Sequence, residues 1–476
     1  MSVGTPDKIL KLAGAIRAEG GRALLVGGCV RDRMMGLAPK DWDVEVYGVE
    51  PARLRQLLEA AGRVDTVGEA FTVYKIGQDL DVSLPRRERK QGRGHRGFII
   101  EGDPSMTIEE ATRRRDFTLN AMLEDPLTGE VIDPFDGRSD LRRKLLRAVA
   151  RETFPEDSLR TLRAAQFAAR FEFDIEPQTI ELCRAINLTD LARERVWGEM
   201  EKLLLRAERP SIGLKWLYEL GAVEQLFPEL KALVGVPQEY EWHPEGDVDV
   251  HTMLVVDRAR ELVDDLPYPK QVTVMLAALC HDFGKPATTA FLEGRWRSRG
   301  HEEAGVPPTE SFLERLNIHT LEGYDVRAQV VALVRDHLKP GEFYNRRHEI
   351  GDSAFRRLAR RCELELLYRV ARADSLGRNA DWVARERWYG AQPQEWFIAR
   401  ARELEVELKP PAPLLLGRHL LAMGIKPGPR VGEITRAVYE LQLDGSVRDL
   451  DEAREAARAI LAAGPPSASS ENNPAG

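Results

Sequence analysis

The sequence has few cysteines and no long apolar run, and both absences narrow the class of protein. Its four cysteines, Cys29, Cys183, Cys280 and Cys362, are scattered and form no C-x-x-C pair. This usage favours reduced thiols over a disulfide framework or a zinc knuckle. No apolar run approaches the roughly 18 residues of a membrane span, and the first residues, MSVGTPDKIL, lack the features of a secretory signal. We therefore predict a cytoplasmic protein that does not enter a membrane.

Positive charge is also in deficit, with 69 lysines and arginines against 77 acidic residues and a net charge of −8. This balance argues against a general nucleic-acid binder, although binding depends on local patches. One basic segment covers residues 86–96 (RRERKQGRGHR), and a second comprises Arg142, Arg143, Lys144, Arg147 and Arg151. Either segment alone is most simply a solvated surface. Both lie close in sequence to the motifs described next, which favours phosphate binding.

A chain of 476 residues is too long for one ordinary core, so three or four domains are expected. The first part is typical of an α/β fold, with predicted strands at 22–28, 41–47, 71–76 and 80–84 and a hairpin over 120–133 that turns at 125–129. From about residue 138 the pattern is almost entirely helical, and residues 155–157 suit a helix start. A proline-rich break at 409–413 predicts a late domain boundary, and the last dozen residues have the composition of a disordered tail.

Two motifs near the N-terminus combine glycine with charge. Gly27-Gly28-Cys29-Val30-Arg31-Asp32 directly follows the first predicted strand. Its glycines let backbone N–H groups approach a phosphate, and Arg31 adds positive charge. Asp41-Trp42-Asp43 lies on the next predicted strand, where alternate residues share a face, so both carboxylates can reach the same metal ions. Paired Mg²⁺ ions can activate a hydroxyl and stabilise a pyrophosphate leaving group.

Two later motifs combine arginines with hydrogen-bonding groups. In residues 114–121 (RRDFTLNA), the arginines can hold phosphate, while Asp116 and Asn120 can contact a ribose. In residues 156–163 (EDSLRTLR), Asp157 and Arg160 are three apart and therefore neighbours on a helix face. The simplest interpretation of that pair is a surface ion pair worth about 0.2–0.5 kcal/mol.

The same pair suggests a chemical basis for base selection. An aspartate accepts hydrogen bonds, whereas an arginine only donates them. Cytosine and adenine each present an exocyclic amine beside an acceptor nitrogen, and guanine and uracil present the reverse pattern. Asp157 and Arg160 could therefore accept C and A yet reject G and U. A wrong base would leave buried polar groups unpaired, at a cost of roughly 1–3 kcal/mol each.

The chain resembles the class II CCA-adding enzymes and their poly(A) polymerase relatives over residues 20–230. Five motifs carry this resemblance in matching order and spacing: LLVGGCVRD, PKDWDVEVY, RRRDFTLNA, EDSLRTLRAAQFAARF and RERVWGEMEKLL. It implies an α/β polymerase-β-like nucleotidyltransferase head followed by an all-α neck. Asp41 and Asp43 are the expected catalytic metal carboxylates, with Mg²⁺ as cofactor, and Arg195 and Glu199 are expected to organise the neck helices. The expected nucleotide-binding residues are Gly27, Gly28, Arg31, Arg115, Asp116, Asn120, Glu156, Asp157, Arg160 and Arg163.

Members of this family add CCA, only CC, only A, or poly(A). The CC-adding members resemble CCA-adding enzymes that lack a flexible loop between the second and third motifs, and here residues 84–112 are long and punctuated by glycine. Residues 68–71 (GEAF) lack the two basic residues that poly(A) polymerases place before the phenylalanine. We rank addition of CCA to tRNA from CTP and ATP first, addition of A alone second, and poly(A) synthesis third. Composition does not separate the first two.

The middle of the chain carries a second set of potential metal ligands. His251 opens VHTMLVVD, His281 and Asp282 close an apolar run in VTVMLAALCHDFGK, and Asp374 lies in RVARADSLGR; His301 and His337 lie between them. Any one of these histidines alone is more often an ordinary core or surface residue. The string H…HD…D resembles the HD phosphohydrolases, which implies that His251, His281, Asp282 and Asp374 bind a transition metal or Mg²⁺. Lys285 could contact phosphate.

Some bacterial CCA-adding enzymes carry such an all-α HD domain after the neck, with phosphatase and 2′,3′-cyclic phosphodiesterase activities, followed by C-terminal helices. The predicted division is therefore a head at 1–148, a neck at 149–235, an HD domain at 236–385, C-terminal helices at 386–464 and a tail at 465–476. The tRNA acceptor end is the expected partner. Two rivals are a phosphohydrolase whose head only recruits RNA and a non-catalytic RNA-binding module; the intact Asp41 and Asp43 argue against both. The sequence leaves the oligomeric state open.

Overall fold

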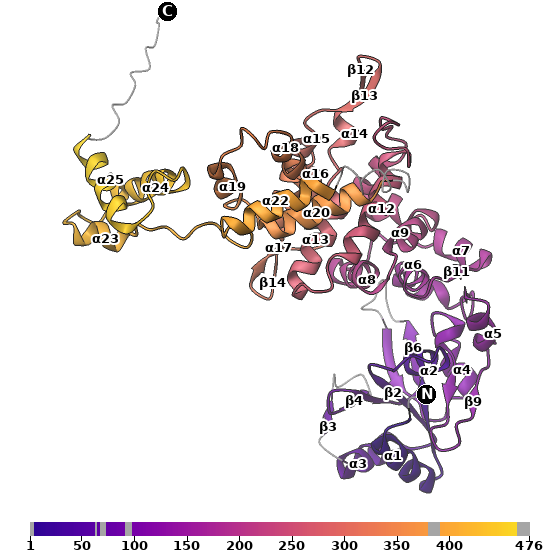
Figure 1. Ribbon diagram of the computed structural model, residues 1–476. Coiled ribbons are helices and arrows are strands. Elements are labelled where there is room, and N and C mark those ends of the chain that lie inside the picture. The colour runs from indigo at the N-terminus through magenta and orange to yellow at the C-terminus, as the bar shows by residue number, and fades with distance from the viewer. Residues whose placement is uncertain (1–3, 62–63, 67–72, 91–97, 379–390, 464–476) are drawn as a thin grey trace, which may run out of the picture. The chain divides into compact units, whose positions relative to one another are not determined.

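The computed structural model describes residues 4–61, 64–66, 73–90, 98–378 and 391–463. The chain forms two compact units, Met1–Lys231 and Ala232–Gly476 (Figure 1). The finer predicted division into head, neck, HD domain and C-terminal helices stays a prediction. Several predicted features lie outside the described residues: the glycine-rich centre of the 84–112 segment, residues 68–71, the boundary at 385 and the tail at 465–476.

A mixed β-sheet forms the centre of the first part of the chain. Among the described residues its seven strands follow the order β3-β4-β5-β2-β1-β8-β9. The strands are β1 (Arg22–Val26), β2 (Trp42–Tyr47), β3 (Val64–Thr66), β4 (Val73–Ile76), β5 (Leu80–Ser83), β8 (Leu123–Glu124) and β9 (Val131–Ile132). Strand β2 runs antiparallel to β1 and parallel to β5. The predicted strands and the β8–β9 hairpin are confirmed, except that residues 71 and 72 lie outside the described chain.

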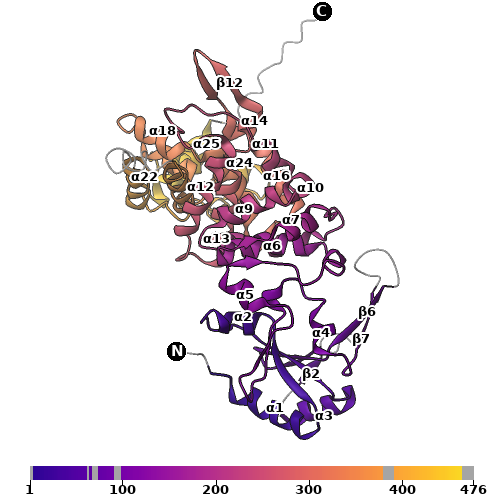
Figure 2. The same cartoon turned by 90° about the vertical axis from the view of Figure 1, so that its right-hand side faces the viewer.

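The two faces of β2 follow from its alternating sequence. Trp42, Val44 and Val46 belong to the core that α1 (Asp7–Ala18) and α3 (Pro51–Ala61) cover. These two helices lie side by side on that face of the sheet (Figure 2). A smaller core that includes Tyr47 packs against α4 (Ile108–Thr112). The acidic side chains that alternate with the apolar ones therefore face away from the α1–α3 core.

A two-stranded ribbon, β6 (Arg86–Lys90) and β7 (Phe98–Gly102), extends away from this sheet (Figure 2). The nearby short elements are α2 (Gly28–Met34), η1 (Thr118–Asn120) and α5 (Gly137–Arg142). Two arginines of the second basic segment form ion pairs with the buried Asp140. Arg143 lies 2.8 Å and Arg147 2.7 Å from its carboxylate. Those two arginines stabilise the fold around α5, which the sequence pattern alone did not indicate.

Helices dominate the rest of the first unit. They are η2 (Phe154–Glu156), α6 (Leu159–Phe171), α7 (Pro177–Arg184), α8 (Arg193–Arg206), α9 (Pro210–Glu219), α10 (Ala222–Leu226) and α11 (Pro228–Leu233), the last of which continues into the second unit. A short parallel pair, β10 (Leu145–Leu146) and β11 (Asp174–Ile175), accompanies them. Helix α6 is buried against α8 and α9, and Gly213 permits this approach because a Cβ there would meet Leu203 at 2.6 Å.

The predicted helix start at residues 155–157 is wrong. Those residues belong to the short 3₁₀ turn η2 and to Asp157, whose backbone is extended at φ −124° and ψ 103°. Helix α6 begins only at Leu159, and the Asp157 carboxylate accepts a hydrogen bond from the Leu159 N–H at 3.2 Å. The glutamate and aspartate of this motif therefore precede the helix, so Asp157 and Arg160 do not share a helix face.

The second unit is built around one helix, α13 (Tyr268–Cys280), which is buried and mainly apolar from Val272 onward. It packs between α12 (Val248–Glu261), α17 (Val326–Asp336) and α20 (Leu364–Leu376). Around it lie α14 (Lys285–Thr288), α15 (His301–Ala304), α16 (Val306–Arg315), α18 (Lys339–Asn345), α19 (Asp352–Leu358) and α22 (Ala391–Glu403). Two small hairpins, β12 (Thr289–Leu292) with β13 (Arg295–Ser298) and β14 (Thr320–Leu321) with β15 (Tyr324–Asp325), interrupt the predicted all-helical pattern.

The last three helices, α23 (Gly417–Ala422), α24 (Pro429–Leu443) and α25 (Leu450–Ala462), share a core of their own. The break predicted at 409–413 separates them from α22 and contains no helix. All four cysteines are free and buried, as predicted. Within the described ranges, no helix is both long and apolar enough to span a bilayer.

Candidate active sites

Three acidic residues alternate with apolar ones at β2: Asp41 directly precedes the strand, and Asp43 and Glu45 lie on it. Asp41 and Asp43 reach solvent, whereas Glu45 is buried and accepts a hydrogen bond from the Tyr47 hydroxyl at 2.5 Å. The parallel register places Asp81 of β5 directly beside Asp43. Although Asp43 reaches solvent, desolvation by the surrounding protein raises its pKa; Arg115 opposes this shift, while Asp81 and Asp41 add to it. Clustered carboxylate oxygens of this kind match the ligand preference of Mg²⁺.

Gly27 and Arg115 form a close contact beside these carboxylates. Gly27 has φ +70°, and a Cβ at this position would meet the Arg115 Nη1 at 2.8 Å. Only glycine adopts this conformation at low cost and leaves the guanidinium its place. Arg115 also lies 3.9 Å from Glu45 and is partly exposed. The glycine turn therefore positions a positive charge next to the acidic strand, where a triphosphate would need it.

Arg31, expected to contact the triphosphate, is buried. Its Nη1 donates to Asn120 at 2.7 Å, and its Nη2 donates to Asp32 at 2.6 Å. The rings of Phe171 and Phe167 lie 4.8 and 5.3 Å from the guanidinium carbon. Arg31 thus links α2 to η1 and α6 through buried contacts. These contacts support the glycine turn that precedes Arg31.

Asp116 is the centre of a buried hydrogen-bond network. One oxygen accepts from the Phe117 N–H at 2.7 Å and from Asn120 at 2.9 Å, and the other accepts from Arg163 at 2.8 Å. Burial alone would raise the pKa of Asp116, but the charge of Arg163 and these hydrogen bonds outweigh it and lower the pKa. Arg163 also lies 3.8 Å from Glu199 of α8. The third and fourth motifs are therefore physically joined.

Asp157 and Arg160 are each held by a different partner. Arg195 of α8 donates to both oxygens of Asp157, at 3.1 and 3.0 Å. Arg160 donates to the backbone carbonyls of Thr153 at 2.7 Å and Arg114 at 2.6 Å, and desolvation lowers its pKa. Glu156 is exposed on the adjacent turn. The predicted neck residues Arg195 and Glu199 thus contact Asp157 and Arg163 of the fourth motif, which is predicted to read the base.

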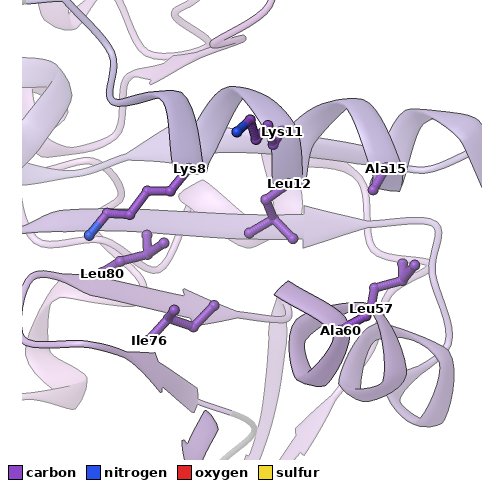
Figure 3. Close-up of a pocket in the computed structure, with 8 residues that line it drawn as sticks. All are labelled: Lys8, Lys11, Leu12, Ala15, Leu57, Ala60, Ile76 and Leu80. Carbon is purple, nitrogen blue, oxygen red and sulfur yellow. The ribbon is translucent and has the colours of Figure 1, made fainter. Parts of the chain in front are cut away.

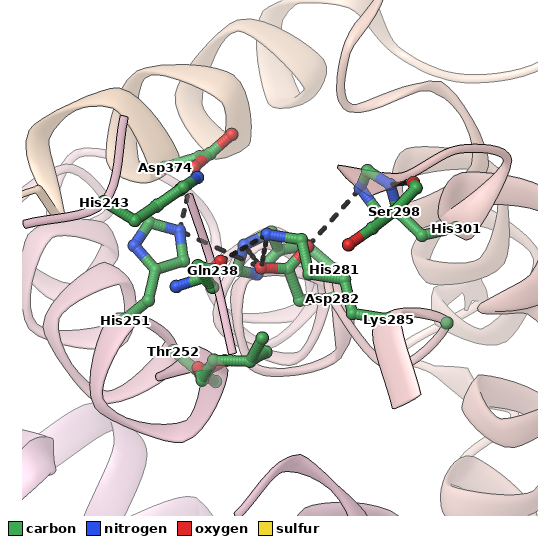
Figure 4. Close-up of polar contacts among 12 residues, drawn as sticks. Gln238, His243, His251, Thr252, His281, Asp282, Lys285, Ser298, His301 and Asp374 are labelled. Atoms are coloured by element: carbon green, nitrogen blue, oxygen red, sulfur yellow. Dashed lines mark hydrogen bonds and ion pairs between the residues drawn. The ribbon is translucent and has the colours of Figure 1, made fainter. Parts of the chain in front are cut away.

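The four predicted HD ligands meet in the second unit (Figure 4). The Nε2 of His251 lies 3.0 Å from Asp374 and 3.9 Å from Asp282, and the Nε2 of His281 lies 3.2 Å from Asp282. Hydrogen bonds and positive neighbours hold the pKa values of both aspartates well below their usual range, against the opposing effect of burial. Among the described residues, the buried His281 Nε2 has no well-aligned hydrogen bond and only the 3.2 Å contact with Asp282, which leaves it suitably placed to bind a metal ion.

Two further histidines complete this cluster. The Nε2 atoms of His301 and His337 lie 3.3 Å apart, and that of His301 lies 3.4 Å from Asp282. Burial, together with nearby His301 and His281, lowers the pKa of His337 to about 3, so its ring is neutral near pH 7. Lys285 contacts Asp282 at 2.7 Å and donates to Gln238 at 2.7 Å, which places its ammonium at the site.

A hollow of about 440 Å³ lies elsewhere in the first unit (Figure 3). Its lining is mainly apolar, and it contains none of the predicted site residues. Its lining residues are Lys8, Lys11, Leu12, Ala15, Leu57, Ala60, Ile76 and Leu80. The predicted site residues lie on the acidic strand and in the HD cluster, outside this hollow.

Comparison with known families gives matches to three segments of the chain. Residues 23–147 match the poly(A) polymerase head domain, residues 172–233 match a probable RNA- and SrmB-binding site of polymerase A, and residues 248–379 match the HD domain. A multifunctional CCA protein of Xanthomonas campestris pv. campestris (strain B100) is 37% identical over 427 residues, which cover 86% of this chain and 95% of that protein. This chain belongs to the multifunctional CCA protein family.

Solved structures of the family share its fold. An apo CCA-adding enzyme matches with a TM-score of 0.60 at 19% identity, over 96% of this chain and 95% of that one. A Thermotoga maritima CCA-adding enzyme complexed with tRNA matches with a TM-score of 0.57 at 18% identity, over 96% of each chain. The expected nucleotidyltransferase head, helical remainder and HD domain are confirmed. The families of both domains are metal-dependent, and the chain contains groups of side chains that could hold a metal ion.

The family motifs do not include every residue at these sites. The sequence did not predict Asp81 as a site residue, because only the pairing of β2 with β5 brings it beside Asp43. The one available signal is that residues 79–83 (DLDVS) alternate acidic and apolar residues, as DWDVEV does. Glu245 was also missed. One of its oxygens lies 2.7 Å from the Nδ1 of His251 and 2.9 Å from the Nδ1 of His243. Burial would raise the pKa of Glu245, but these two histidines lower it to about 2.

Proposed function

We propose that this chain adds CCA to the 3′ end of tRNA, using CTP and ATP without a nucleic-acid template. The observation that carries the proposal is the pair of solvent-facing carboxylates, Asp41 and Asp43, beside Arg115 and the glycine turn. The same unit connects this acidic strand to a base-reading motif through the network around Asp116. A module that only bound RNA would have no use for clustered, exposed carboxylates on one strand face.

Asp41 and Asp43 would hold Mg²⁺, which when bound lowers the pKa of the RNA 3′-hydroxyl and stabilises the leaving pyrophosphate. Arg115 supplies positive charge to the triphosphate, at the position that Gly27 leaves open. Asp116 and Asn120, which the sequence predicts to contact the ribose, are buried and bonded to Arg163 and Arg31, so they would support the ribose-binding surface from within. Arg31 acts from behind, since it anchors Asn120 and α2.

Asp157 and Arg160 select the base. The Asp157 carboxylate accepts a hydrogen bond from the exocyclic amine of C or A, and Arg160 donates to the neighbouring ring nitrogen. Two of the Arg160 nitrogens bond to backbone carbonyls, which fixes the plane of a group that has five N–H donors. Glu156 and Arg163 border this position. Selection of C and A over G and U then depends on matching donors to acceptors.

One incorporation assay tests the transferase proposal. Labelled CTP and ATP are offered separately to tRNAs that end at the discriminator base, after one C and after two Cs. CTP should enter the first two and ATP only the third. Incorporation of ATP alone, and only after two Cs, would make this an A-adding enzyme. Repeated ATP addition to unrelated RNA would make it a poly(A) polymerase, and no incorporation would overturn the proposal.

We also propose that the HD cluster hydrolyses phosphate esters at RNA ends, including 2′,3′-cyclic phosphates. The supporting observation is the convergence of His251, His281, Asp282 and Asp374 on one buried point, with Lys285 beside them. A transition metal or Mg²⁺ bound there would supply an activated water. Water that opens the cyclic ester at its 3′ oxygen leaves a 2′-phosphate and a free 3′-hydroxyl, and hydrolysis of a terminal 3′-phosphate releases inorganic phosphate and the same hydroxyl. Nucleotide transfer requires that hydroxyl, which gives a reason for both sites to share one chain.

Two single substitutions separate the activities. Asp41→Ala should abolish nucleotide transfer and leave hydrolysis of 2′,3′-cyclic AMP intact, and His281→Ala should do the reverse. Hydrolysis is assayed with Mg²⁺, Mn²⁺, Ni²⁺ and Co²⁺ in turn. Loss of both activities from either folded variant would contradict the two-site proposal, and inactivity with every metal would remove the hydrolase. The tRNA acceptor end stays the proposed RNA partner, and a cytoplasmic location stays a prediction.

A further inference from the structure

Exposed aromatic side chains gather at one place in the second unit. Among the described residues, four aromatic side chains are largely open to solvent, and all four lie in two short segments. Tyr240 (76% exposed) and Trp242 belong to one segment, and Phe291 (60% exposed) and Trp296 belong to the β12–β13 hairpin. Single apolar side chains on a surface are ordinary, whereas a cluster of them usually marks a site of recognition. These four residues are called the aromatic surface below.

The hairpin brings the two segments together. Phe291 and Trp296 form a cross-strand pair, and their ring centroids lie 5.2 Å apart in an edge-to-face arrangement. The Trp296 backbone N–H donates to Glu239 at 3.1 Å, and Arg295 donates to Glu241 at 2.9 Å. The hairpin projects from the helices of its unit (Figures 1 and 2). The aromatic surface is therefore accessible to a ligand.

Both segments adjoin the HD cluster (Figure 4). Gln238 accepts a hydrogen bond from Lys285 at 2.7 Å, and the Ser298 carbonyl accepts one from the Nδ1 of His301 at 2.7 Å. A strand rises about 3.3 Å per residue, so Trp296 lies roughly 7 Å along β13 from Ser298. The aromatic surface thus begins within a few nucleotides' length of the cluster.

Arginines accompany the aromatic residues. Trp296 lies between Arg295 and Arg297 on β13, and Arg299 follows the strand. Arg297 and Arg299 lie 3.0 and 3.8 Å from Glu293, in pairs so exposed that a phosphate can replace the carboxylate at low cost. Single-stranded RNA is bound by aromatic rings that stack on its bases and by cations that contact its backbone.

A protein partner is the alternative occupant, because aromatic rings and arginine also suit protein interfaces. The position of the aromatic surface favours RNA. Its two segments lead directly to the cluster for which an RNA end is the proposed substrate, and the nucleotides that precede such an end have bases free to stack.

We propose that the aromatic surface binds the unpaired bases of a single-stranded RNA whose end lies in the HD cluster. Phe291 and Trp296 stack on the bases, and Arg297 and Arg299 contact the phosphates. The inference rests on the proposed hydrolase and names its substrate class: a single-stranded oligoribonucleotide with a terminal or cyclic phosphate, in preference to a mononucleotide or a duplex end. Stacking accepts every base, so the preference should not depend on sequence.

Hydrolysis of three substrates by the full-length chain tests this preference. They are a short single strand that ends in a 2′,3′-cyclic phosphate, a blunt duplex with the same end, and 2′,3′-cyclic AMP. The value of kcat/KM should be about 100-fold higher for the single strand than for cyclic AMP, about tenfold for each of two stacked bases, and the duplex should show no such gain. Equal values for the single strand and cyclic AMP would overturn the proposal.

Two substitutions test the role of the hairpin. Phe291→Ala and Trp296→Ala should each lower the ratio of kcat/KM for the single strand to that for cyclic AMP about tenfold, through a higher KM for the single strand. Leu421→Ala is the matched control, because Leu421 is a similarly exposed apolar residue (45%) of α23, and its ratio should equal that of the parent. Equal losses toward both substrates would show that the hairpin only supports the fold of the cluster, which would overturn the proposal. Circular dichroism establishes folding, and if neither variant folds, the ratio in the parent decides.

Photocrosslinking locates the RNA without requiring hydrolysis. A short single strand with iodouridine beside its end, irradiated with the metal-free parent protein, should form adducts on Phe291 or Trp296 that mass spectrometry identifies. Such adducts in a protein that hydrolyses none of the substrates with any metal would keep the RNA surface and remove the hydrolase. Adducts confined to the first unit would overturn the inference. A dimer that Trp296→Ala dissociates would also overturn it, because the surface would then bind a second copy of the chain.

Discussion

Arg195 holds the carboxylate of Asp157 by donating to both of its oxygens, at 3.1 and 3.0 Å. The acid assigned to base selection is therefore oriented by a helix more than thirty residues further along the chain. Its supposed helix neighbour, Arg160, is held by two backbone carbonyls instead. The two residues proposed to select the base thus have separate hydrogen-bond partners, and the partner of Asp157 can be removed without changing those of Arg160.

Arg195→Ala should reduce the fidelity of nucleotide addition more than it reduces stability. The pair is about one-third exposed on both sides, and such ion pairs contribute about 0–1 kcal/mol to folding. Without Arg195, Asp157 can rotate away from the exocyclic amine of the base. We expect the preference for CTP over UTP, measured as a ratio of kcat/KM values, to fall about tenfold, which corresponds to about 1.4 kcal/mol. Arg195→Lys should restore part of it.

Arg206→Ala serves as the control for this experiment. It removes the same charge from the exposed C-terminal end of the same helix, away from Asp157. Its CTP preference should equal that of the parent protein. An unchanged preference in Arg195→Ala would show that Asp157 does not depend on Arg195 for its orientation.

Asp116→Asn should destabilise the first unit by about 2–3 kcal/mol at neutral pH, because it weakens the buried contact with Arg163. The folded-state pKa of Asp116 is lowered, so its contribution is fully present above the unfolded value of about 3.9. That contribution is lost as the pH falls through the lower folded value. Urea unfolding, monitored by hydrogen exchange in α6, gives the free energy of unfolding of the parent and of Asp116→Asn. The difference between the two should be constant from pH 7 to about pH 5 and should shrink below about pH 4. A difference that grew in acid would refute this assignment.

The acidic strand shows how far the sequence leads. The alternation in DWDVEV predicted a strand with two faces, and the structure places Trp42 and Val44 in the core and Asp43 at the surface, as periodicity requires. The four predicted HD ligands also lie together in the structure, as the sequence predicts. His281 and Asp282 follow a helix so apolar that it had to be central, and this fixes their position.

What the sequence did not predict depends on contacts between distant segments. An arginine is usually exposed at the surface. Arg31 is instead enclosed by Phe167 and Phe171, which lie far along the chain. The helix of the fourth motif starts only after Asp157, whose backbone is extended and whose carboxylate contacts Arg195 of α8. Asp81 required the strand register to be known. In each case the sequence does not indicate which distant residue lies next to the residue in question in the folded chain.

Gly27→Ala should weaken nucleotide binding, and Gly36→Ala provides its control. Both glycines have positive φ, +70° and +74°, so alanine strains the backbone at both positions, and the strain is greater at Gly27 because its ψ of −128° lies outside the left-handed helical region. Only at Gly27 would the new Cβ meet Arg115, at 2.8 Å; at Gly36 nothing lies within 4 Å. We expect the KM for CTP and ATP to rise about tenfold in Gly27→Ala alone. Equal KM values in the two variants would mean that strain, and not Arg115, is responsible.

Gly284→Ala should disrupt the HD cluster although residue 284 carries no ligand. A Cβ there would lie 1.9 Å from the His301 carbonyl oxygen and 2.5 Å from the Gly305 nitrogen, both backbone atoms that cannot rotate aside. Helix α15 must then move, and His301 with it. We expect a loss of about 1–3 kcal/mol in stability and a fall in bound Mn²⁺.

Gly341→Ala, a helical site in the same unit with nothing within 4 Å, should instead gain about 0.5–1 kcal/mol. Thermal unfolding and metal analysis of both variants decide the matter, because an equal midpoint and metal content in Gly284→Ala and the parent would show that this close approach does not position His301.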